Sequence, residues 1–126
     1  MYSFLLVGAG GAIGAMARYG LASLVGRTWP ISFPLGTLLI NIIGSVGMGL
    51  LIGLMARFLP SWQTEARLFV AVGILGGFTT FSTFSLDTVA LIERGELLQA
   101  GFYVLLSVVL CLIGLYLGLL VTRGVA

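Results

Sequence analysis

The ten charged side chains of this chain leave four long blocks of apolar sequence between them. A helix that crosses the hydrocarbon core of a bilayer needs about 20 predominantly apolar residues, and each block is long enough to supply them. The blocks without any charged residue are 1–17, 28–56, 68–86 and 97–122. We therefore predict four spanning helices, close to residues 2–25, 35–57, 67–92 and 97–122.

The composition supports a membrane protein and argues against a water-soluble one. Hydrophobic residues make up 60% of the chain and charged residues only 8%, whereas soluble domains carry about 25% charged residues. Lipid offers no partner to the exposed edge of a sheet, so an open chain can cross it only as helices. We predict an all-α membrane protein whose residues 1–126 form one multi-pass transmembrane domain in the cytoplasmic membrane.

The residue types that most enzymes and metal sites need are missing from this sequence. It contains no His and a single Cys, so the commonest general base and the Cys-cluster zinc sites are excluded. The expected protein is accordingly not an enzyme.

The six Arg residues divide equally between the two sides of the predicted membrane domain. The side that holds the chain termini and the 57–67 loop carries Arg57, Arg67 and Arg123, and the other carries Arg18, Arg27 and Arg94. An excess of positive charge normally sets the orientation of a membrane protein, and here there is none. Either a few charges balance by chance, or both orientations are inserted and pair as an antiparallel, dual-topology homodimer.

The third block contains the most informative segment, which runs from Gly76 to Ser85 with the sequence GGFTTFSTFS. Each glycine costs a helix interior about 1 kcal/mol relative to Ala, and hydroxyl side chains offer the backbone competing hydrogen bonds. We therefore predict that the third helix is broken near residues 76–79, in the middle of the membrane. Hydroxyl donors follow at Thr79, Thr80, Ser82, Thr83, Ser85 and Thr88.

Phe81 and Phe84 share one face of the helix after the predicted break. Phe at this spacing usually serves packing. The edge of an aromatic ring is electropositive, however, and the interleaving of these rings with hydroxyl groups favours a second role, in which the ring edges solvate a small anion.

Polar residues also form stripes on the other predicted spans. Thr37, Asn41 and Ser45 follow one another at intervals of four, as do Tyr103, Ser107 and Cys111, and this spacing places each set on one helical face. Asn41 either joins helices or offers its amide donors to an anion, whereas Cys111 is interpreted as an inert buried thiol.

Arg18 is the one charge well inside an apolar span. Its guanidinium either reaches the membrane interface or places a positive charge at a vestibule that attracts an anion.

The inward faces are therefore rich in neutral donors and poor in carboxylates, a pattern that suits a small anion. A drug exporter of the small multidrug resistance type has a similar size and charge balance, but it needs a carboxylate in the first span, which this span lacks. In a non-transporting membrane scaffold, the glycines and hydroxyls would only hold helices together.

The segment Gly76–Ser85 resembles the Fluc/CrcB family of fluoride channels. The likeness extends to Gly10-Gly11-x-x-Gly14-x-x-x-Arg18 in the first span and to Pro34-Leu35-Gly36-Thr37-x-x-x-Asn41 in the second, and it covers essentially the whole chain. The resemblance implies passive, selective fluoride efflux that protects the cell from fluoride. It also implies an antiparallel homodimer with two pores.

The resemblance further assigns roles to individual residues. It implies an ion pathway formed by Asn41, Phe81, Phe84, Tyr103, Ser107, Thr37, Ser82, Thr83 and Arg18. It implies a structural Na⁺ at the dimer axis, held by the backbone carbonyls of Gly76 and Thr79. Two positions depart from the family pattern: Asp87 stands in place of Glu, and Cys111 and Leu115 replace hydroxyls further along the fourth span.

Overall fold

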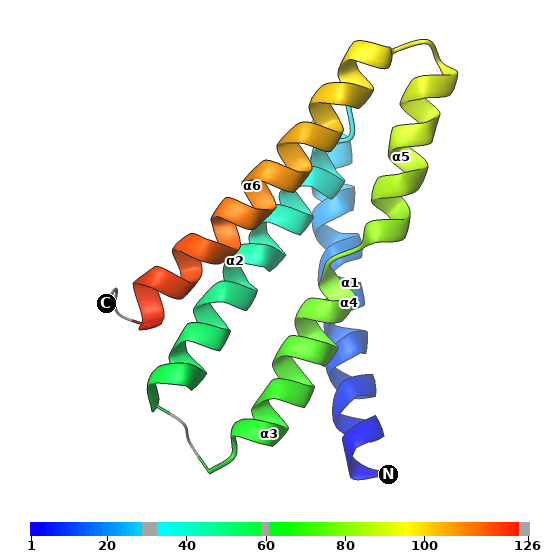
Figure 1. Ribbon diagram of the computed structural model, residues 1–126. Helices are drawn as coiled ribbons and strands as arrows, with labels where there is room; N and C mark the ends of the chain where they lie inside the picture. Colours follow the sequence, from blue (N-terminus) through cyan, green and yellow to red (C-terminus); the bar gives the residue numbers. More distant parts are fainter. Residues whose placement is uncertain (29–32, 59–60, 124–126) are drawn as a thin grey trace.

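The computed structural model describes residues 1–28, 33–58 and 61–123, and every regular element in these segments is helical (Figure 1). The elements are α1 (Tyr2–Thr28), α2 (Leu35–Phe58), α3 (Gln63–Ala66), η1 (Arg67–Leu75), α4 (Gly76–Phe78), α5 (Phe81–Glu93) and α6 (Leu97–Arg123).

The described residues contain four helical stretches that are long and apolar enough to cross a membrane. Three are α1, α2 and α6, and the fourth is the interrupted stretch Gln63–Glu93, which comprises α3, η1, α4 and α5. The predicted all-α class with four spanning helices is confirmed. The third stretch begins at Gln63 rather than at the predicted residue 67.

The turn between α5 and α6 shows how local sequence ends a helix. Gly95 has a φ of +80°, a conformation that glycine adopts without steric cost. The N–H of Gly95 donates to the Ile92 carbonyl at 3.0 Å and the N–H of Glu96 to the Leu91 carbonyl at 2.9 Å. This pair of bonds is a Schellman motif, and it terminates α5 at the sequence Arg94-Gly95-Glu96.

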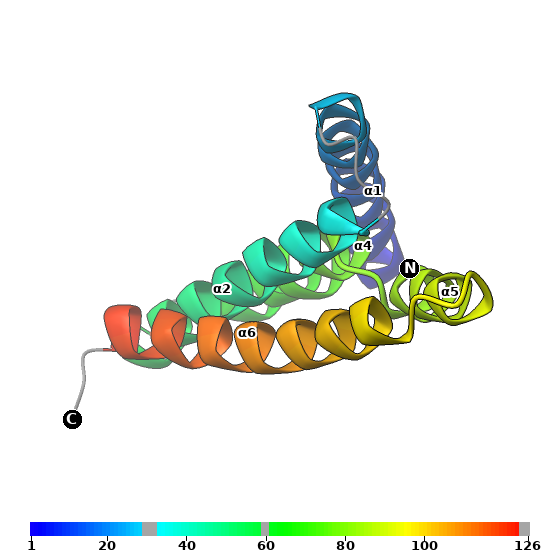
Figure 2. The same ribbon diagram turned by 90° about the horizontal axis from the view of Figure 1, so that it is seen from above.

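The helices form two packed groups with α5 at one end. Figures 1 and 2 show α6 lying beside α2, while α1 packs on the other side against η1 and α4. α5 turns away from η1 and α4, and it rests mainly against α6. In Figure 1, α1 and α3 begin and α2 ends toward the lower end of the molecule, whereas α6 ends at its left side.

Glycines allow the close approach of α1 to the third stretch. A Cβ at Gly14 would overlap the Ile74 carbonyl oxygen and would lie 2.8 Å from the Phe78 nitrogen. A Cβ at Gly10 would lie 2.9 Å from the Gly73 Cα. Backbone therefore packs directly on backbone at this contact, as the small-xxx-small spacing predicts.

The contact between α2 and α6 follows the same principle. A Cβ at Gly49 would overlap the Leu115 carbonyl oxygen, and a Cβ at Gly118 would lie 2.7 Å from the Val46 carbonyl oxygen. The glycine pairs Gly49/Gly53 and Gly114/Gly118 thus bring α2 and α6 together, as their small-xxx-small spacing favours.

The first half of the third stretch is a π-helix, which the sequence did not lead us to expect. η1 covers Arg67–Leu75, and at its end the N–H of Gly76 donates to the Ala71 carbonyl, five residues earlier. Such wide turns are rare and occur most often near functional sites. Here the π-helix immediately precedes the short helix that leads into the break.

Large apolar side chains cover much of the outer surface. Leu105, Val108 and Leu112 of α6 are 58%, 50% and 66% exposed, and Phe4 of α1 is 80% exposed. An apolar surface on this scale requires lipid or another protein to cover it. The fold therefore belongs in a membrane.

We predict that Gly14→Ala destabilises the protein, because its new methyl group meets backbone that cannot move aside. Overpacking of this kind costs about 1–3 kcal/mol, so the thermal unfolding midpoint in detergent should fall clearly. Gly20→Ala is the matched control, since nothing lies within 4 Å of a Cβ at that position of α1. Equal midpoints in the two variants would contradict the packing role of Gly14.

Candidate functional site

The third stretch is interrupted by two extended residues, Thr79 and Thr80. Thr79 has φ −84° and ψ 158°, and Thr80 has φ −152° and ψ 126°. The predicted break near residues 76–79 is therefore displaced toward its C-terminal edge, because Gly76 and Gly77 remain helical within α4. The Thr80 hydroxyl accepts a hydrogen bond from the Thr83 N–H at 3.3 Å and caps α5.

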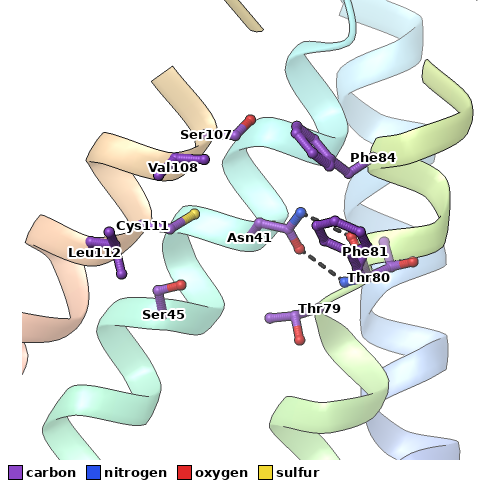
Figure 3. A pocket seen from close by; sticks show the side chains of 10 residues that line it. All are labelled: Asn41, Ser45, Thr79, Thr80, Phe81, Phe84, Ser107, Val108, Cys111 and Leu112. Atoms are coloured by element: carbon purple, nitrogen blue, oxygen red, sulfur yellow. Dashed lines mark hydrogen bonds between the residues drawn. The ribbon is translucent and has the colours of Figure 1, made fainter. Parts of the chain in front are cut away.

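Asn41 of α2 holds this break through a reciprocal pair of hydrogen bonds (Figure 3). Its Nδ2 donates to the Thr80 carbonyl at 3.0 Å, and its Oδ1 accepts from the Thr80 N–H at 2.9 Å. Both backbone groups of an extended residue are thus satisfied by one side chain. The amide carries two N–H groups, so a second one remains for another acceptor. Asn41 therefore joins helices and still keeps a donor.

Arg18 of α1 contacts the same region from the opposite side. Its Nε donates to the Gly77 carbonyl at 3.1 Å. A cation at the carbonyl end of a helix is electrostatically favourable. Arg18 is absent from the lining of the cavity described below, and it acts here as a support for the helix that leads into the break.

Most hydroxyls of the third stretch are already engaged. Thr79, Ser85 and Thr88 donate to carbonyls of their own stretch at 3.0, 3.0 and 2.8 Å. Ser82 and Thr83 lie 3.3 Å from the Thr80 hydroxyl. The supply of free donors is thus smaller than the six hydroxyls in the sequence suggested.

A cavity of about 330 Å³ opens beside the break, between α2, α5 and α6 (Figure 3). Every residue that lines it is uncharged. The lining comprises Asn41, Ser45, Thr79, Thr80, Phe81, Phe84, Ser107, Val108, Cys111 and Leu112.

Ser107 is the clearest free donor in this cavity. The residue is only 6% exposed, and its buried Oγ has no hydrogen-bond partner in the described part of the chain. A buried hydroxyl without a partner costs free energy unless something else bonds it. The N-terminus of α5 also borders the cavity at Phe81, and the partial positive charge of a helix N-terminus favours an anion.

Phe81 and Phe84 lie together at the N-terminus of α5. Their ring centroids are 5.4 Å apart and the rings are tilted by 46°. Phe81 is 77% exposed, so packing within the chain does not account for its position. Both rings line the cavity, as they must if their edges are to solvate an anion there.

Tyr103 and Thr37 lie next to the cavity rather than in its lining. The Tyr103 ring is fully buried, with its centroid 5.0 Å from that of Phe84. Its hydroxyl donates to Asp87 Oδ2 at 3.2 Å, and the Thr37 hydroxyl lies beside the same phenol oxygen. The Phe84 ring thus lies between the cavity and a second group of polar side chains, formed by Tyr103, Asp87 and Thr37.

The backbone at the break offers oxygens that suit a hard cation. In the described part of the chain, the carbonyl oxygens of Gly76 and Thr79 accept no hydrogen bond from any turn or neighbouring element. Free carbonyl oxygens are the ligands that a hard cation accepts. These two residues therefore fit the Na⁺ that the resemblance implies.

The structure brings together four of the predicted pathway residues: Asn41, Phe81, Phe84 and Ser107 line one cavity. Tyr103 and Thr37 adjoin it, whereas Ser82 and Thr83 stay in the hydroxyl cluster around Thr80. The sequence reasoning did not select Ser45 and Cys111 for the site. Their spacing of four residues from Asn41 and Ser107 was the signal that could have placed them there.

Four spanning helices, one of them broken beside an uncharged cavity, define a multi-pass membrane protein with a candidate ion pathway. The chain belongs to the CrcB-like family, since the family model described as "CrcB-like protein, Camphor Resistance (CrcB)" matches residues 5–119. The resemblance noted in the sequence is confirmed.

Relatives of nearly the same length carry a more specific name. A "Fluoride-specific ion channel FluC" of Paracoccus denitrificans is 53% identical over 98% of this chain and 96% of its own. Proteins of the same name from Roseobacter denitrificans and Hyphomonas neptunium are 50% and 47% identical, each over 99% of this chain and 98% of its own. These relatives are named as ion channels and not as enzymes, in agreement with the prediction from composition.

We predict that Asn41→Ala lowers stability, because it leaves both backbone groups of Thr80 without a partner. Each lost bond costs about 1 kcal/mol and an unsatisfied buried group about 1–3 kcal/mol, which should lower the unfolding midpoint in detergent. Ser45→Ala, one turn along the same face of α2, is the control. A midpoint unaffected by Asn41→Ala would show that the break persists without this side chain.

Proposed function

We propose that this protein is a fluoride-selective channel that lets F⁻ leave the cell passively across the cytoplasmic membrane and so protects it from fluoride. The observation that carries the proposal is the uncharged cavity at the helix break, with a free hydroxyl, an amide and two aromatic rings in its lining. Relatives named as fluoride-specific channels match this chain over nearly its whole length.

The chemistry of the lining favours an anion. Ser107 and Asn41 present donors to the cavity, α5 presents the positive end of its dipole, and no carboxylate borders it. Many cation pathways instead carry rings of acidic side chains. A small anion with a tight hydration shell needs several such donors in succession, each weak enough to release it.

The proposed pathway runs from the cavity along α6. The ring edges of Phe81 and Phe84 solvate fluoride together with the Asn41 amide and Ser107. The hydroxyls of Thr37, Ser82, Thr83 and Tyr103 extend the polar track on either side. Arg18 adds positive potential through its contact with α4.

The functional unit in this proposal is an antiparallel homodimer with two pores. The exposed apolar surface of α6 supports a second copy, and the equal division of Arg residues supports opposite orientations. The Gly76 and Thr79 carbonyls of both copies would hold one Na⁺ at the dimer axis. When bound, the ion supplies positive charge and joins the two broken helices.

The first prediction of this proposal concerns the purified protein in liposomes loaded with KF. We expect F⁻ efflux down its gradient, measured with a fluoride electrode, only when valinomycin lets K⁺ compensate the charge. Dissipating the pH gradient should leave the rate unchanged, because no proton is carried. Absence of efflux, or efflux that needs no charge compensation, would exclude a passive fluoride channel.

The aromatic rings provide the variants for the same assay. Phe81→Ile and Phe84→Ile remove an electropositive edge while keeping an apolar side chain, and each should lower efflux about tenfold, equivalent to about 1.4 kcal/mol in the barrier. Phe4→Ile is the control, since Phe4 is 80% exposed on α1 and far from the cavity lining. Equal fluxes in all three would assign Phe81 and Phe84 to packing.

Dual topology predicts two-sided labelling of the connection between α2 and α3. The test variant is Trp62→Cys in a Cys111→Ser background, because Trp62 is 62% exposed. Its thiol should react with a membrane-impermeant maleimide both from outside intact cells and from the cytoplasmic side of inverted vesicles. About half of the chains should react from each side if both orientations are equally inserted. Labelling from one side alone would rule out the antiparallel dimer.

A further inference from the structure

Cys111 is the only cysteine of the chain, and the structure places it in the wall of the cavity. Its side chain is a free thiol of intermediate exposure. Figure 3 shows the sulfur directed toward the side of the cavity lined by Asn41 and Ser45. This position differs from the inert buried thiol that the sequence suggested.

A second observation shows that this part of the wall is built to receive a polar or ionic group. Ser107 lies one turn before Cys111 on the same face of α6. Its Oγ is buried and has no partner among the described residues, and Ser107 lines the same cavity. Cys111 therefore lies four residues, about 6 Å along the helix axis, beyond an unoccupied hydrogen-bond donor.

We propose that Cys111 is a thiol-modification site inside the ion pathway, at which a small uncharged thiol reagent attaches and stops ion passage. The inference rests on the proposed fluoride pathway. An adduct on Sγ extends into a space of about 330 Å³ and replaces a weak S–H donor with an apolar group. It therefore narrows the cavity and removes one of the donors that an anion could use in the step beyond Ser107.

The reaction can be written with methyl methanethiosulfonate as the probe. The Cys111 thiol loses its proton to solvent, and the thiolate attacks the reagent's methylthio sulfur. A new S–S bond forms while the S–SO₂ bond breaks, and methanesulfinate leaves with the electron pair. The thiol is oxidised to a mixed disulfide, and the reagent is reduced. Dithiothreitol reverses the change by thiol–disulfide exchange.

The neutral, uncharged lining determines which reagents enter. No basic residue lines the cavity to attract an anionic reagent, and no acidic residue lines it to attract a cationic one. A small neutral probe pays no charge-desolvation cost on entry, so it should react where a cationic methanethiosulfonate of similar size does not.

The experiment uses the wild-type chain, which is already a single-cysteine protein. Purified protein is treated with methyl methanethiosulfonate at mildly alkaline pH, its mass is measured, and fluoride efflux from liposomes is recorded. We expect one methylthio group per chain, efflux reduced to the level of protein-free vesicles, and recovery of efflux after dithiothreitol.

Two variants distinguish the effect of modifying a thiol in the cavity from the effect of modifying one elsewhere on α6. Cys111→Ser, compared with its own untreated flux, should be insensitive to the reagent, and Cys111→Ala replaces it if the serine variant does not fold. Val109→Cys in the Cys111→Ser background carries a thiol two residues away that is absent from the cavity lining, and its labelling should leave efflux unchanged.

Each result decides the inference. Labelling of Cys111 without loss of efflux overturns it, as does a thiol that does not react. Loss of efflux in Cys111→Ser after treatment also overturns it. If the untreated wild type releases no fluoride, the proposed function fails, and the mass measurement still shows separately whether the cavity thiol is open to the reagent.

Discussion

The reciprocal pair of hydrogen bonds between Asn41 and Thr80 is the constraint on which the site depends. Two extended residues in the middle of a membrane helix leave backbone groups that lipid cannot satisfy, and each such group costs several kcal/mol. Asn41 meets both groups of Thr80 at 3.0 and 2.9 Å. Because the amide is held in this way, its position and its remaining N–H are fixed at the wall of the cavity, and α5 can leave the direction of α4.

Close packing of the helix backbones determines where the two hydrogen bonds between Asn41 and Thr80 can form. Gly14 brings α1 onto Ile74 and Phe78 just before the break, and Arg18, one turn further along α1, bonds the Gly77 carbonyl. On the other side, a Cβ at Gly44 would overlap the Thr79 methyl group, so α2 also lies directly against the break. The break therefore lies between α1 and α2, because Gly14 and Gly44 let both helices approach it closely.

The four helices were predicted well from the sequence, because a helix needs a fixed length of apolar residues to cross the membrane. The charged residues mark where each apolar block ends. It predicted the break less accurately. The two glycines were expected to interrupt the helix, yet they remain helical and the interruption falls on Thr79 and Thr80. There, the two hydrogen bonds from Asn41 stabilise the extended backbone of Thr80. The π-helix of Arg67–Leu75 and the contact of Arg18 with Gly77 were not predictable, since both depend on the neighbouring helix. The same applies to the hydroxyls, whose engagement depends on local carbonyls rather than on composition.

The break also explains how one short segment can present opposite polarity to its surroundings. α4 ends there, so its last carbonyls form a negative end, and α5 begins there, so its first N–H groups form a positive end. No charged side chain lines the cavity, so these backbone dipoles act on it directly. A neutral lining beside the positive end favours an anion, while the carbonyl end favours a cation. A helix without the break would have satisfied these groups internally and offered neither.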